Sequence, residues 1–467
     1  MDQVQYQHWL HALKNKDKRP AYLKIVDLIS ADIENGKLQV RDRLPPLREL
    51  ANFLKLDYTT AARAYREAKS RGLIDSQRGM GSFIRGKTKT ISAGKNNNFD
   101  MTMNLPPEPQ SWAFTEKVTS SAREAIASQE LYSLLRYQDF GGSMEDKEAA
   151  KELLSPLIPN PNINQVLVCP GIHSVLVALL SQLTSEGGTV CVENLTYPGI
   201  KAISAQLGAK LTAIDCDSSG PLIKPLEALC KTQDIAAIYL NPTIQNPTTR
   251  TISKARREAI ADIALRYSIP IIEDDAYGLL PEKPVSPIFT LAPELTYYIT
   301  GLAKCFGAGL RIAYLYAPSK LLAQRTASTL RALSVMTSPI SAALATHWIR
   351  DGSINEMIRL IRDESRTRQE IAANYLSPYK VDAHSDGFHL WLTLPNTFDF
   401  NPSVIAAHLR SQQVSVVSSA AFCTNNNPPH AVRICLGGAI SHADCEEAMQ
   451  IVSDTLEHPS HLSSTVI

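Results

Sequence analysis

The sequence of 467 residues contains no apolar run long enough to span a membrane, no C-x-x-C pair and no internal repeat. It has eight cysteines, all after residue 168, and several stand inside apolar runs. The lack of paired cysteines argues against a zinc site, and the pattern predicts reduced thiols in a cytoplasmic protein. The start of the chain is polar, which predicts that no signal peptide opens it, and we expect no membrane partner.

Net charge is also nearly absent, at +1, but the charges are unevenly distributed. Residues 1–90 hold 18 lysines and arginines against 10 acidic residues, a net charge of +8. The remaining residues hold 29 against 36, a net charge of −7. This asymmetry predicts that the first part binds a polyanion and the second does not, although a first part that is only incidentally basic would look the same.

The first part reads as three short helices followed by two strands. Apolar spacing predicts helices over residues 21–33, 47–54 and 59–69, with Asp57 as the N-cap of the third. Residues 73–84 predict two strands around a glycine turn, and residues 1–19 a polar lead-in. This order predicts a winged helix-turn-helix domain over residues 1–86, followed by a polar linker over 87–103.

The second part, residues 104–467, alternates strand-like and helical stretches. The strand candidates are residues 165–169, 189–192, 211–214, 236–240, 269–272 and 297–300. This alternation predicts an α/β fold with a mainly parallel sheet. From about residue 335 we expect a smaller α+β unit, with strands at 388–394, 414–417 and 433–436.

Four segments of the first part, residues 43–51, 58–65, 71–74 and 78–83, resemble the GntR family of bacterial transcription regulators. The resemblance implies that the third helix enters the major groove of operator DNA and that the wing reaches the minor groove. The DNA-binding residues that it implies are Arg48, Tyr58, Thr59, Thr60, Arg63, Arg78 and Gly79. Arg48 and Arg63 could instead simply be solvated. Tyr58 stands where the family often has arginine.

Lys304 has the neighbours that a pyridoxal 5′-phosphate (PLP) site needs. Asp274 stands at a strand end, where a carboxylate can hold the pyridinium nitrogen, and Tyr277 follows three residues later. Arg311, seven residues after Lys304, suits a phosphate. A single lysine is more often a solvated surface cation, so the interpretation depends on this set.

Residues 100–455 resemble the fold-type I aminotransferases, in the variety fused to GntR-type heads, the MocR/GabR subfamily. The runs that carry the resemblance are CPGIHS at 169–174, ENLTYPG at 193–199, QNPTT at 245–249, EDDAY at 273–277 and AVRICL at 431–436. It implies PLP as cofactor, with a Schiff base on Lys304. The further cofactor-binding residues that it implies are Gly171, Ile172, His173, Tyr197, Asn246, Asp274, Tyr277 and Arg311. It also implies that Arg433 clamps the carboxylate of an effector or substrate.

Several alternatives and departures stay open at this point. Asn241 also precedes a Pro-Thr pair and competes with Asn246, while Asp275 competes with Asp274. Thr249 replaces the usual glycine of its loop. Gly301 and Ala303 replace hydroxyl residues, so that a phosphate ligand is missing or Thr300 supplies it. Arg433 could form a structural salt bridge instead of a clamp.

We interpret the chain as a transcription regulator that senses PLP, an amino compound or both through an aminotransferase-like domain, rather than as an enzyme in its own right. The alternatives are a working PLP-dependent aminotransferase with a DNA-binding appendage and a regulator that senses free PLP only. Because heads of this type read paired half-sites and fold-type I sites are completed across a dimer, we expect a homodimer on a two-part operator. No metal is expected.

Overall fold

The computed structural model describes residues 6–14, 19–35, 37–38, 42–71, 73–77, 81–84, 98–184, 187–395 and 401–457. The chain divides into two compact units, residues 1–97 and 98–467. The predicted linker at 87–97 lies outside the described residues. Residues 98–103, also predicted as linker, belong to the second unit, because strand β3 (Phe99–Asp100) pairs in parallel with β15 (Val414–Ser415).

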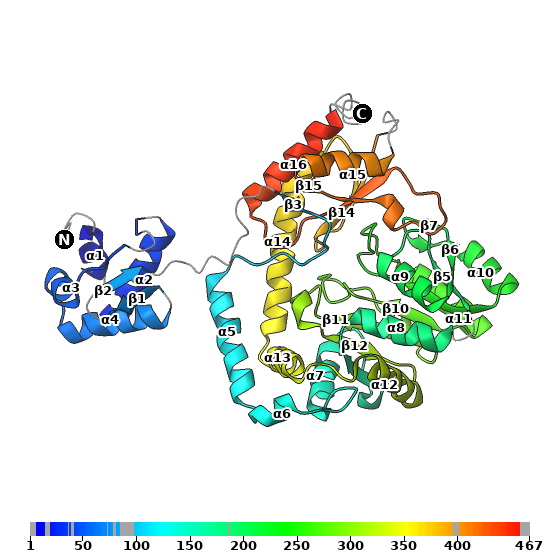
Figure 1. Ribbon diagram of the computed structural model, residues 1–467, viewed down its shortest axis with the longest axis horizontal. Helices are drawn as coiled ribbons and strands as arrows, with labels where there is room; N and C mark the ends of the chain where they lie inside the picture. Colours follow the sequence, from blue (N-terminus) through cyan, green and yellow to red (C-terminus); the bar gives the residue numbers. More distant parts are fainter. Residues whose placement is uncertain are drawn as a thin grey trace. The chain divides into compact units, whose positions relative to one another are not determined.

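The first unit is a small helical domain with a two-stranded hairpin (Figure 1). Its elements are α1 (Gln7–Lys14), α2 (Ala21–Glu34), α3 (Leu47–Leu54), α4 (Tyr58–Ser70), β1 (Ile74–Gln77) and β2 (Gly81–Ile84). The strands β1 and β2 pair antiparallel, with Ile74 opposite Ile84. Asp57 holds the N-cap position of α4, as predicted, but its side chain makes no capping hydrogen bond.

Helix α1 corrects the prediction of a polar lead-in over residues 1–19. Trp9 is fully buried in the core of the unit, and its Nε1 donates to Oδ2 of Asp32 at 2.6 Å. The ring of Tyr6 packs edge-on against Trp9, with centroids 5.0 Å apart. Two buried aromatic rings are enough to anchor this short helix, although the residues around them are polar.

The second unit is built on a seven-stranded sheet with the order β4-β12-β11-β10-β9-β5-β6. The strands are β4 (Val166–Cys169), β5 (Thr189–Glu193), β6 (Lys210–Ile214), β9 (Ile235–Leu240), β10 (Ile271–Asp274), β11 (Thr296–Gly301) and β12 (Ala313–Tyr316). The prediction of a mainly parallel sheet is confirmed. Strand β12, which the sequence did not predict, runs antiparallel to both of its neighbours.

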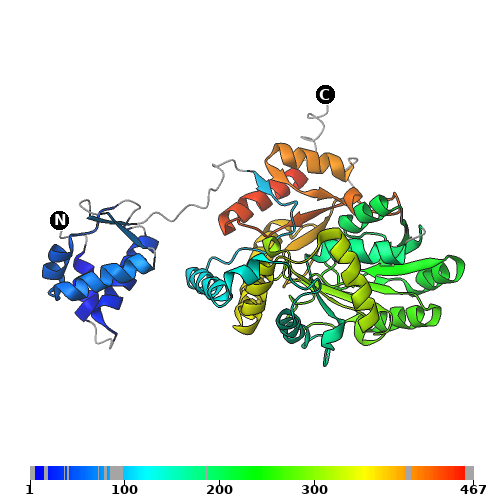
Figure 2. The ribbon, with the colours of Figure 1, turned by 60° about the horizontal axis from the view of Figure 1, so that its bottom comes forward.

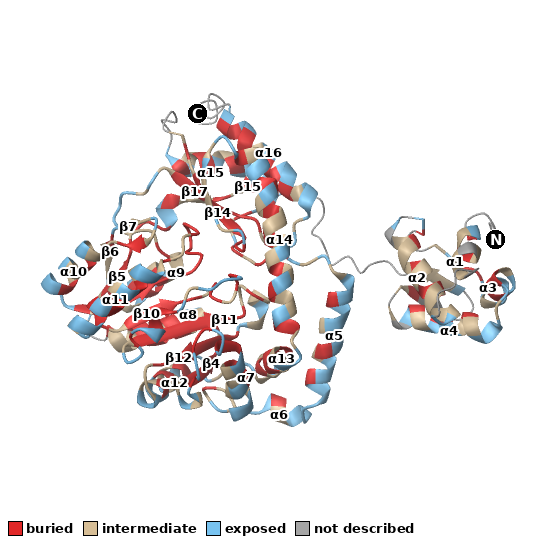
Figure 3. Ribbon diagram, turned by 180° about the vertical axis from the view of Figure 1, so that it is seen from behind, coloured by how far each residue is buried: buried red, intermediate tan, exposed pale blue. Residues whose placement is uncertain are grey.

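Helices cover both faces of this sheet (Figure 2). One face carries α8 (Ile172–Leu183), α9 (Pro198–Leu207) and α12 (Lys320–Ser334). The other face carries α7 (Met144–Leu154), α10 (Ile223–Thr232), α11 (Lys254–Tyr267) and α13 (Pro339–Arg350). All strands except the edge strand β6 are therefore mostly buried on both sides, which explains their continuous apolar runs. Figure 3 shows them as buried.

A long helix, α14 (Ser353–Leu376), joins this part to a smaller subdomain (Figure 1). Ile354, Ile358 and Ile361 pack in the large core, whereas Ile371 and Leu376 pack in the small one. The small subdomain holds a four-stranded antiparallel sheet of β13 (Lys380–Ala383), β14 (His389–Thr393), β17 (Ala431–Cys435) and β16 (Val417–Ser418), with α15 (Pro402–Ser411) and α16 (His442–Glu457). The smaller unit expected from about residue 335 is present, but α13 and the first half of α14 belong to the large part.

The remaining elements lie outside the two main sheets. They are the helices α5 (Trp112–Ala127) and α6 (Leu131–Leu135), and the short hairpin of β7 (Cys216–Asp217) with β8 (Gly220–Pro221). Within the described residues, no helix is both long and apolar enough to cross a membrane.

Candidate functional sites

Helix α4 presents a polar face to solvent and an apolar face to the core. Ala61, Ala64 and Ala68 are fully buried, whereas Tyr58 is 53% exposed and Arg63 is exposed. Thr59 is exposed and Thr60 is partly buried. The predicted DNA-facing residues of α4 therefore share one accessible side.

Two arginines near α4 are placed for contact with a polyanion. Arg48 lies exposed in the first turn of α3. The guanidinium of Arg63 stacks 4.1 Å from the ring centroid of Tyr22, which fixes its direction. Arg66, exposed one turn after Arg63, is a further candidate that the sequence motif did not single out. Arg78 and Gly79, predicted at the wing tip, lie outside the described residues.

The second candidate site lies at the carboxyl end of β10, where Asp274 and Asp275 point to opposite faces. Asp274 lies on the face of Tyr239, whose hydroxyl donates to Asp274 Oδ2 at 2.8 Å. Asp275 lies on the other face and accepts from Tyr298 at 2.9 Å. Because successive side chains alternate across a strand, only one of these carboxylates can serve a given face.

Asp274 is buried and only half satisfied. Its Oδ1 has no hydrogen-bond partner among the described residues. Burial raises the pKa of Asp274 to about 6; the Tyr239 hydroxyl opposes the rise, and the Asp275 carboxylate adds to it. A cationic donor at Oδ1, such as a pyridinium N–H, would satisfy this atom and stabilise its charge.

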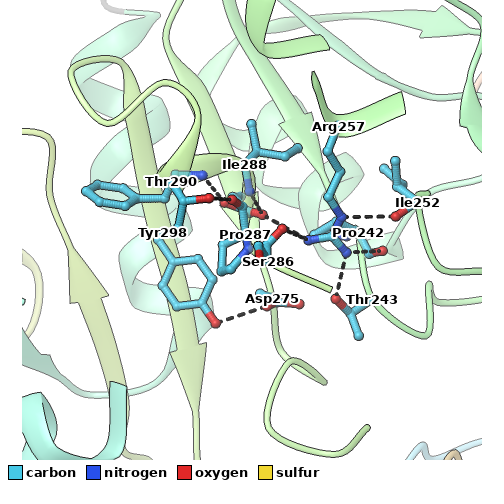
Figure 4. Close-up of polar contacts among 12 residues, drawn as sticks. Pro242, Thr243, Ile252, Arg257, Asp275, Ser286, Pro287, Ile288, Thr290 and Tyr298 are labelled. Carbon is cyan, nitrogen blue, oxygen red and sulfur yellow. Dashed lines mark hydrogen bonds and ion pairs between the residues drawn. The ribbon is translucent and has the colours of Figure 1, made fainter. Parts of the chain in front are cut away.

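The opposite face of β10 is held by a buried arginine (Figure 4). Arg257 donates to the backbone oxygens of Ile252 and Pro242 at 3.0 and 3.1 Å, and to Thr243 Oγ1 at 3.2 Å. It lies 3.6 Å from Glu273, which accepts from the backbone N–H groups of Ile288 and Phe289. This cluster fixes the end of β10 and the loop that follows β9.

Lys304 lies beyond the end of β11, partly buried. Its Nζ donates to the backbone oxygen of Asn104 and lies 5.6 Å from the ring centroid of Tyr277. Burial lowers the pKa of Lys304 to about 8; Arg433 lowers it further, whereas Cys435 and Asp274 raise it. An amine with this pKa is neutral in a useful fraction near neutral pH, as a carbonyl-attacking nucleophile must be.

Arg311 lies at the N-terminus of α8. An added methyl group at Gly171 would come within 2.7 Å of Arg311 Nη2, and Gly171 has φ +97°, which favours glycine. Among the described residues, the Arg311 guanidinium has no hydrogen-bond or ion-pair partner. Arg311 is exposed, so water screens its repulsion from the positive end of the helix dipole, but an anion between the two would be attracted by both, so this pair suits a phosphate.

The backbone donors of this anion site differ from the predicted set. The N–H of Gly171 donates to Cys169 at 2.8 Å and is not available. Ile172 and His173 begin α8, so their N–H groups have no acceptor within the helix. Burial, with a further contribution from Arg311, lowers the pKa of His173.

The backbone explains two positions, Gly301 and Thr249, at which the sequence differs from the family motifs. A side chain at Gly301 would come within 2.9 Å of the backbone oxygen of Ile312, so the usual hydroxyl residue does not fit there. The Thr300 hydroxyl donates to the Asp275 backbone oxygen at 3.1 Å and is not free to replace it. Thr249 adopts φ +63°, the left-handed conformation that glycine adopts more readily, so its backbone keeps the glycine conformation.

Asn246 and Arg433 meet across the site. Arg433 Nη1 donates to Asn246 Oδ1 at 2.8 Å, and Nη2 donates to the Thr102 backbone oxygen. Asn241 is already used by the fold: its Nδ2 donates to the Asp274 backbone oxygen, and its Oδ1 accepts from the N–H of Asn246. The geometry therefore favours Asn246 over Asn241 as a ligand-facing residue.

Arg433 is not part of a structural salt bridge within the described residues. It is 6% exposed, its partners are neutral oxygens, and its Nε has no partner. Its guanidinium lies 4.9 Å from the ring centroid of Phe422. A buried cation without a counterion is costly, which favours binding of a carboxylate.

Two tyrosines complete the predicted set. The ring of Tyr197 lies against Gly199, where an added methyl group would come within 2.2 Å of Tyr197 Cε1. The hydroxyl of Tyr277 accepts from Asn104 Nδ2 at 2.7 Å, which places Tyr277 beside the partner of Lys304.

The sequence motifs missed three residues near this site. Asn104 contacts both Tyr277 and Lys304, and Tyr239 holds Asp274. His389 is fully buried with an unpartnered Nδ1, and burial and Arg433 lower its pKa to about 3, so it is neutral. None of the three stands in a recognisable run, and only Asn104, in a proline-rich stretch, gave any local signal.

The chemical groups of these residues match the groups of PLP. They offer an unpartnered carboxylate oxygen, an amine of lowered pKa, and an unpaired arginine beside a helix N-terminus. The fold and this site define a protein with a winged helix-turn-helix unit and a fold-type I aminotransferase unit.

Comparison with known families agrees with both parts. The chain belongs to the aminotransferase class I and II family, whose model matches residues 100–452. Residues 21–84 match the model of the bacterial regulatory proteins of the gntR family. This combination is that of the MocR/GabR type of regulator.

Relatives of similar length carry regulator names. The chain is 26% identical to the uncharacterized HTH-type transcriptional regulator YdeF of Bacillus subtilis, over 95% of this chain and 96% of that protein. It is 25% identical to the vitamin B6 salvage pathway transcriptional repressor PtsJ of Salmonella typhimurium, over 88% and 93%.

Solved structures share the fold of the second unit. LysN, an α-aminoadipate aminotransferase from Thermus thermophilus, gives a TM-score of 0.71 at 19% identity, covering 86% of this chain and 100% of that chain. A kynurenine aminotransferase from Pyrococcus horikoshii gives 0.71 at 18% identity, covering 78% and 92%.

Proposed function

We propose that this chain is a cytoplasmic transcription regulator that binds operator DNA through its first unit and senses PLP, with or without an amino compound, through its second. The observation that carries the proposal is that one chain presents both an exposed polar face on α4 and a site with an amine of lowered pKa at Lys304, an unpartnered carboxylate oxygen at Asp274 and an arginine beside a helix N-terminus at Arg311. The regulator names of relatives that align over nearly the whole chain support it.

Each residue of the second site has a proposed task. Lys304 is the amine that attaches PLP, Asp274 keeps its ring nitrogen protonated, and Arg311 with the first turn of α8 holds its phosphate. Tyr197 covers the ring, and Asn246 and Tyr277 contact its phenolic oxygen. Bound PLP would supply an electron sink for bonds to an attached amine.

Arg433 is proposed as the carboxylate clamp for the amino compound. Its Nε is unpartnered, and its Nη1 contact with Asn246 links the clamp to the cofactor residues. A guanidinium pairs with a carboxylate through two parallel hydrogen bonds, which would select amino acids over simple amines.

A working aminotransferase is the second candidate. Lys304 has the lowered pKa that a nucleophilic amine needs, and the solved neighbours of the second unit are aminotransferases. Sustained turnover of an amino donor and a keto acid, beyond one equivalent of enzyme, would support it. If protein that binds PLP shows no turnover, the experiment supports the function as a regulator over that as an aminotransferase.

We also propose a homodimer. Large apolar side chains lie exposed along α6 and beside it, and α5 exposes Trp112. The set is Trp112, Leu131, Tyr132, Leu135 and Tyr137, of which Tyr137 is 79% exposed. The exposed apolar side chains on and beside α6 fit a second copy of the chain.

Absorbance titration with PLP tests the cofactor site. Wild-type protein should gain an absorbance band near the visible edge that saturates with PLP, and Lys304→Ala should abolish it. An unchanged band in the variant would place the attachment on another amine.

A further inference from the structure

The first residues of the second unit form a strap across the candidate PLP site. The strap comprises residues 98–107. Its ends are held by backbone hydrogen bonds: Phe99 donates to Gln413 at 2.7 Å, Met101 to Ser415 at 3.0 Å, and Gly438 to Pro106 at 3.1 Å. The strap follows directly on residue 97, where the first unit ends.

The middle of the strap binds the two cations of the site through backbone oxygens. Thr102 accepts from Arg433 Nη2, and Asn104 accepts from Lys304 Nζ. The Asn104 side chain also donates to the Tyr277 hydroxyl at 2.7 Å, and its own Oδ1 is buried without a partner. Three residues of the ligand site therefore hold two residues of the strap.

Ligand binding requires the same donors. When the Lys304 amine condenses with the PLP aldehyde, a C=N bond forms and one water leaves, so Nζ keeps at most one N–H bond. A carboxylate that pairs end-on with Arg433 would draw on Nη1 and Nη2, the nitrogens that now donate to Asn246 and Thr102. Either event weakens the hold on a strap carbonyl, and the loss is most costly at Asn104, which is a buried residue.

We propose that the strap is the element that senses ligand: occupation of the Lys304 and Arg433 site releases Thr102 and Asn104, and the strap changes position at the start of the second unit. This inference rests on the proposed function, because it takes PLP as the ligand of Lys304. The released strap passes the change to the chain that leads to the DNA-binding unit. The coupling is limited to the difference in ligand affinity between the held and the released strap.

The two glycines after β17 give a matched pair of variants. A methyl group at Gly437 would lie 1.6 Å from the Leu105 backbone oxygen, so Gly437→Ala must push the strap away. A methyl group at Gly438 would meet nothing within 4 Å, although Gly438 has φ +79°. Gly438→Ala therefore adds a backbone strain that Gly437→Ala lacks, keeps its N–H bond to Pro106 and does not collide with the strap.

The first experiment measures hydrogen exchange in the full-length wild-type protein, without ligand, with saturating PLP, and with PLP plus excess acetate as a carboxylate probe. Peptides covering the strap should exchange at least about threefold faster with PLP, and α12 should not change. Saturable PLP absorbance with unchanged strap exchange would overturn the strap inference and leave the proposed function. The absence of saturable PLP binding would overturn both.

The second experiment measures binding to an operator duplex selected with the wild-type protein. Gly437→Ala without PLP should bind the duplex with the affinity of PLP-saturated wild type, and PLP should change it less than twofold. Gly438→Ala should respond to PLP as wild type does. A full PLP response in a folded Gly437→Ala would overturn the inference. If Gly437→Ala does not fold, the hydrogen-exchange result in the wild-type protein decides whether ligand releases the strap.

Discussion

Arg433 donates to Asn246 Oδ1 across 2.8 Å and so ties the small subdomain to the loop after β9. The same guanidinium has an unpartnered Nε and no acidic partner among the described residues. We expect Arg433→Ala to keep PLP binding, to release the Thr102 part of the strap and to lose the response of operator affinity to an amino compound. Operator affinity, measured with PLP and a panel of amino acids, checks this. A variant that still responds normally would show that Arg433 is not the clamp.

The pKa of Lys304, near 8, sets a pH dependence for PLP attachment. The attacking amine must be neutral, so the attachment rate should rise with pH below about 8 and level off above it. Arg433→Gln removes a positive charge that lowers this pKa, so its midpoint should move to higher pH. Stopped-flow absorbance measures both profiles. A rate that is flat from pH 6 to 9 in both proteins would contradict the assigned amine.

The exposed arginines of the first unit should contribute to DNA affinity. Arg48→Ala and Arg63→Ala should each weaken operator binding by about 1–3 kcal/mol and leave PLP absorbance unchanged. Wild-type binding should also fall as salt rises. Arg71→Ala is a matched control, because Arg71 is already paired with Glu67 at 2.9 Å. Equal losses in all three variants would point to a general effect of charge.

The apolar side chains on α6 should hold a dimer. Leu131 and Leu135 are 61% and 62% exposed, so replacing both with aspartate costs little in the isolated chain. The double variant should sediment as a monomer at micromolar concentration, with an unchanged circular dichroism spectrum, where wild type sediments as a dimer. If the wild-type protein sediments as a monomer, the proposed dimer is wrong.

The sequence predicted the parts of the fold that repeat a periodic pattern. Helix α3 has its predicted bounds, and the parallel strands were found because each is a short apolar run between turn residues. Helix α1 was missed because the segment before residue 20 was interpreted as polar. The contact of Trp9 with Asp32 joins residues 23 positions apart, so it leaves no local pattern in the sequence. Strand β12 was not predicted, although it is as short as β4 and β10, which were.

The candidate site was predictable where motifs are local. Asp274, Tyr277 and Lys304 stand in short runs, and the alternation along β10 separates Asp274 from Asp275. The contact of Asn104 with Lys304 joins residues 200 positions apart and leaves no local pattern. Nor could the sequence show that Gly301 has no room for a hydroxyl side chain, because the obstacle is the backbone of β12 and the residue before it.

The central claim is that PLP at Lys304 controls DNA binding by the same chain. Its most direct test is the dissociation constant for the selected operator duplex, with and without PLP, for wild type and Lys304→Ala at one salt concentration. The account predicts a change of about tenfold for wild type, typical of allosteric coupling, and none for Lys304→Ala. An equal change in both proteins, or no change in wild-type protein that demonstrably binds PLP, would contradict it.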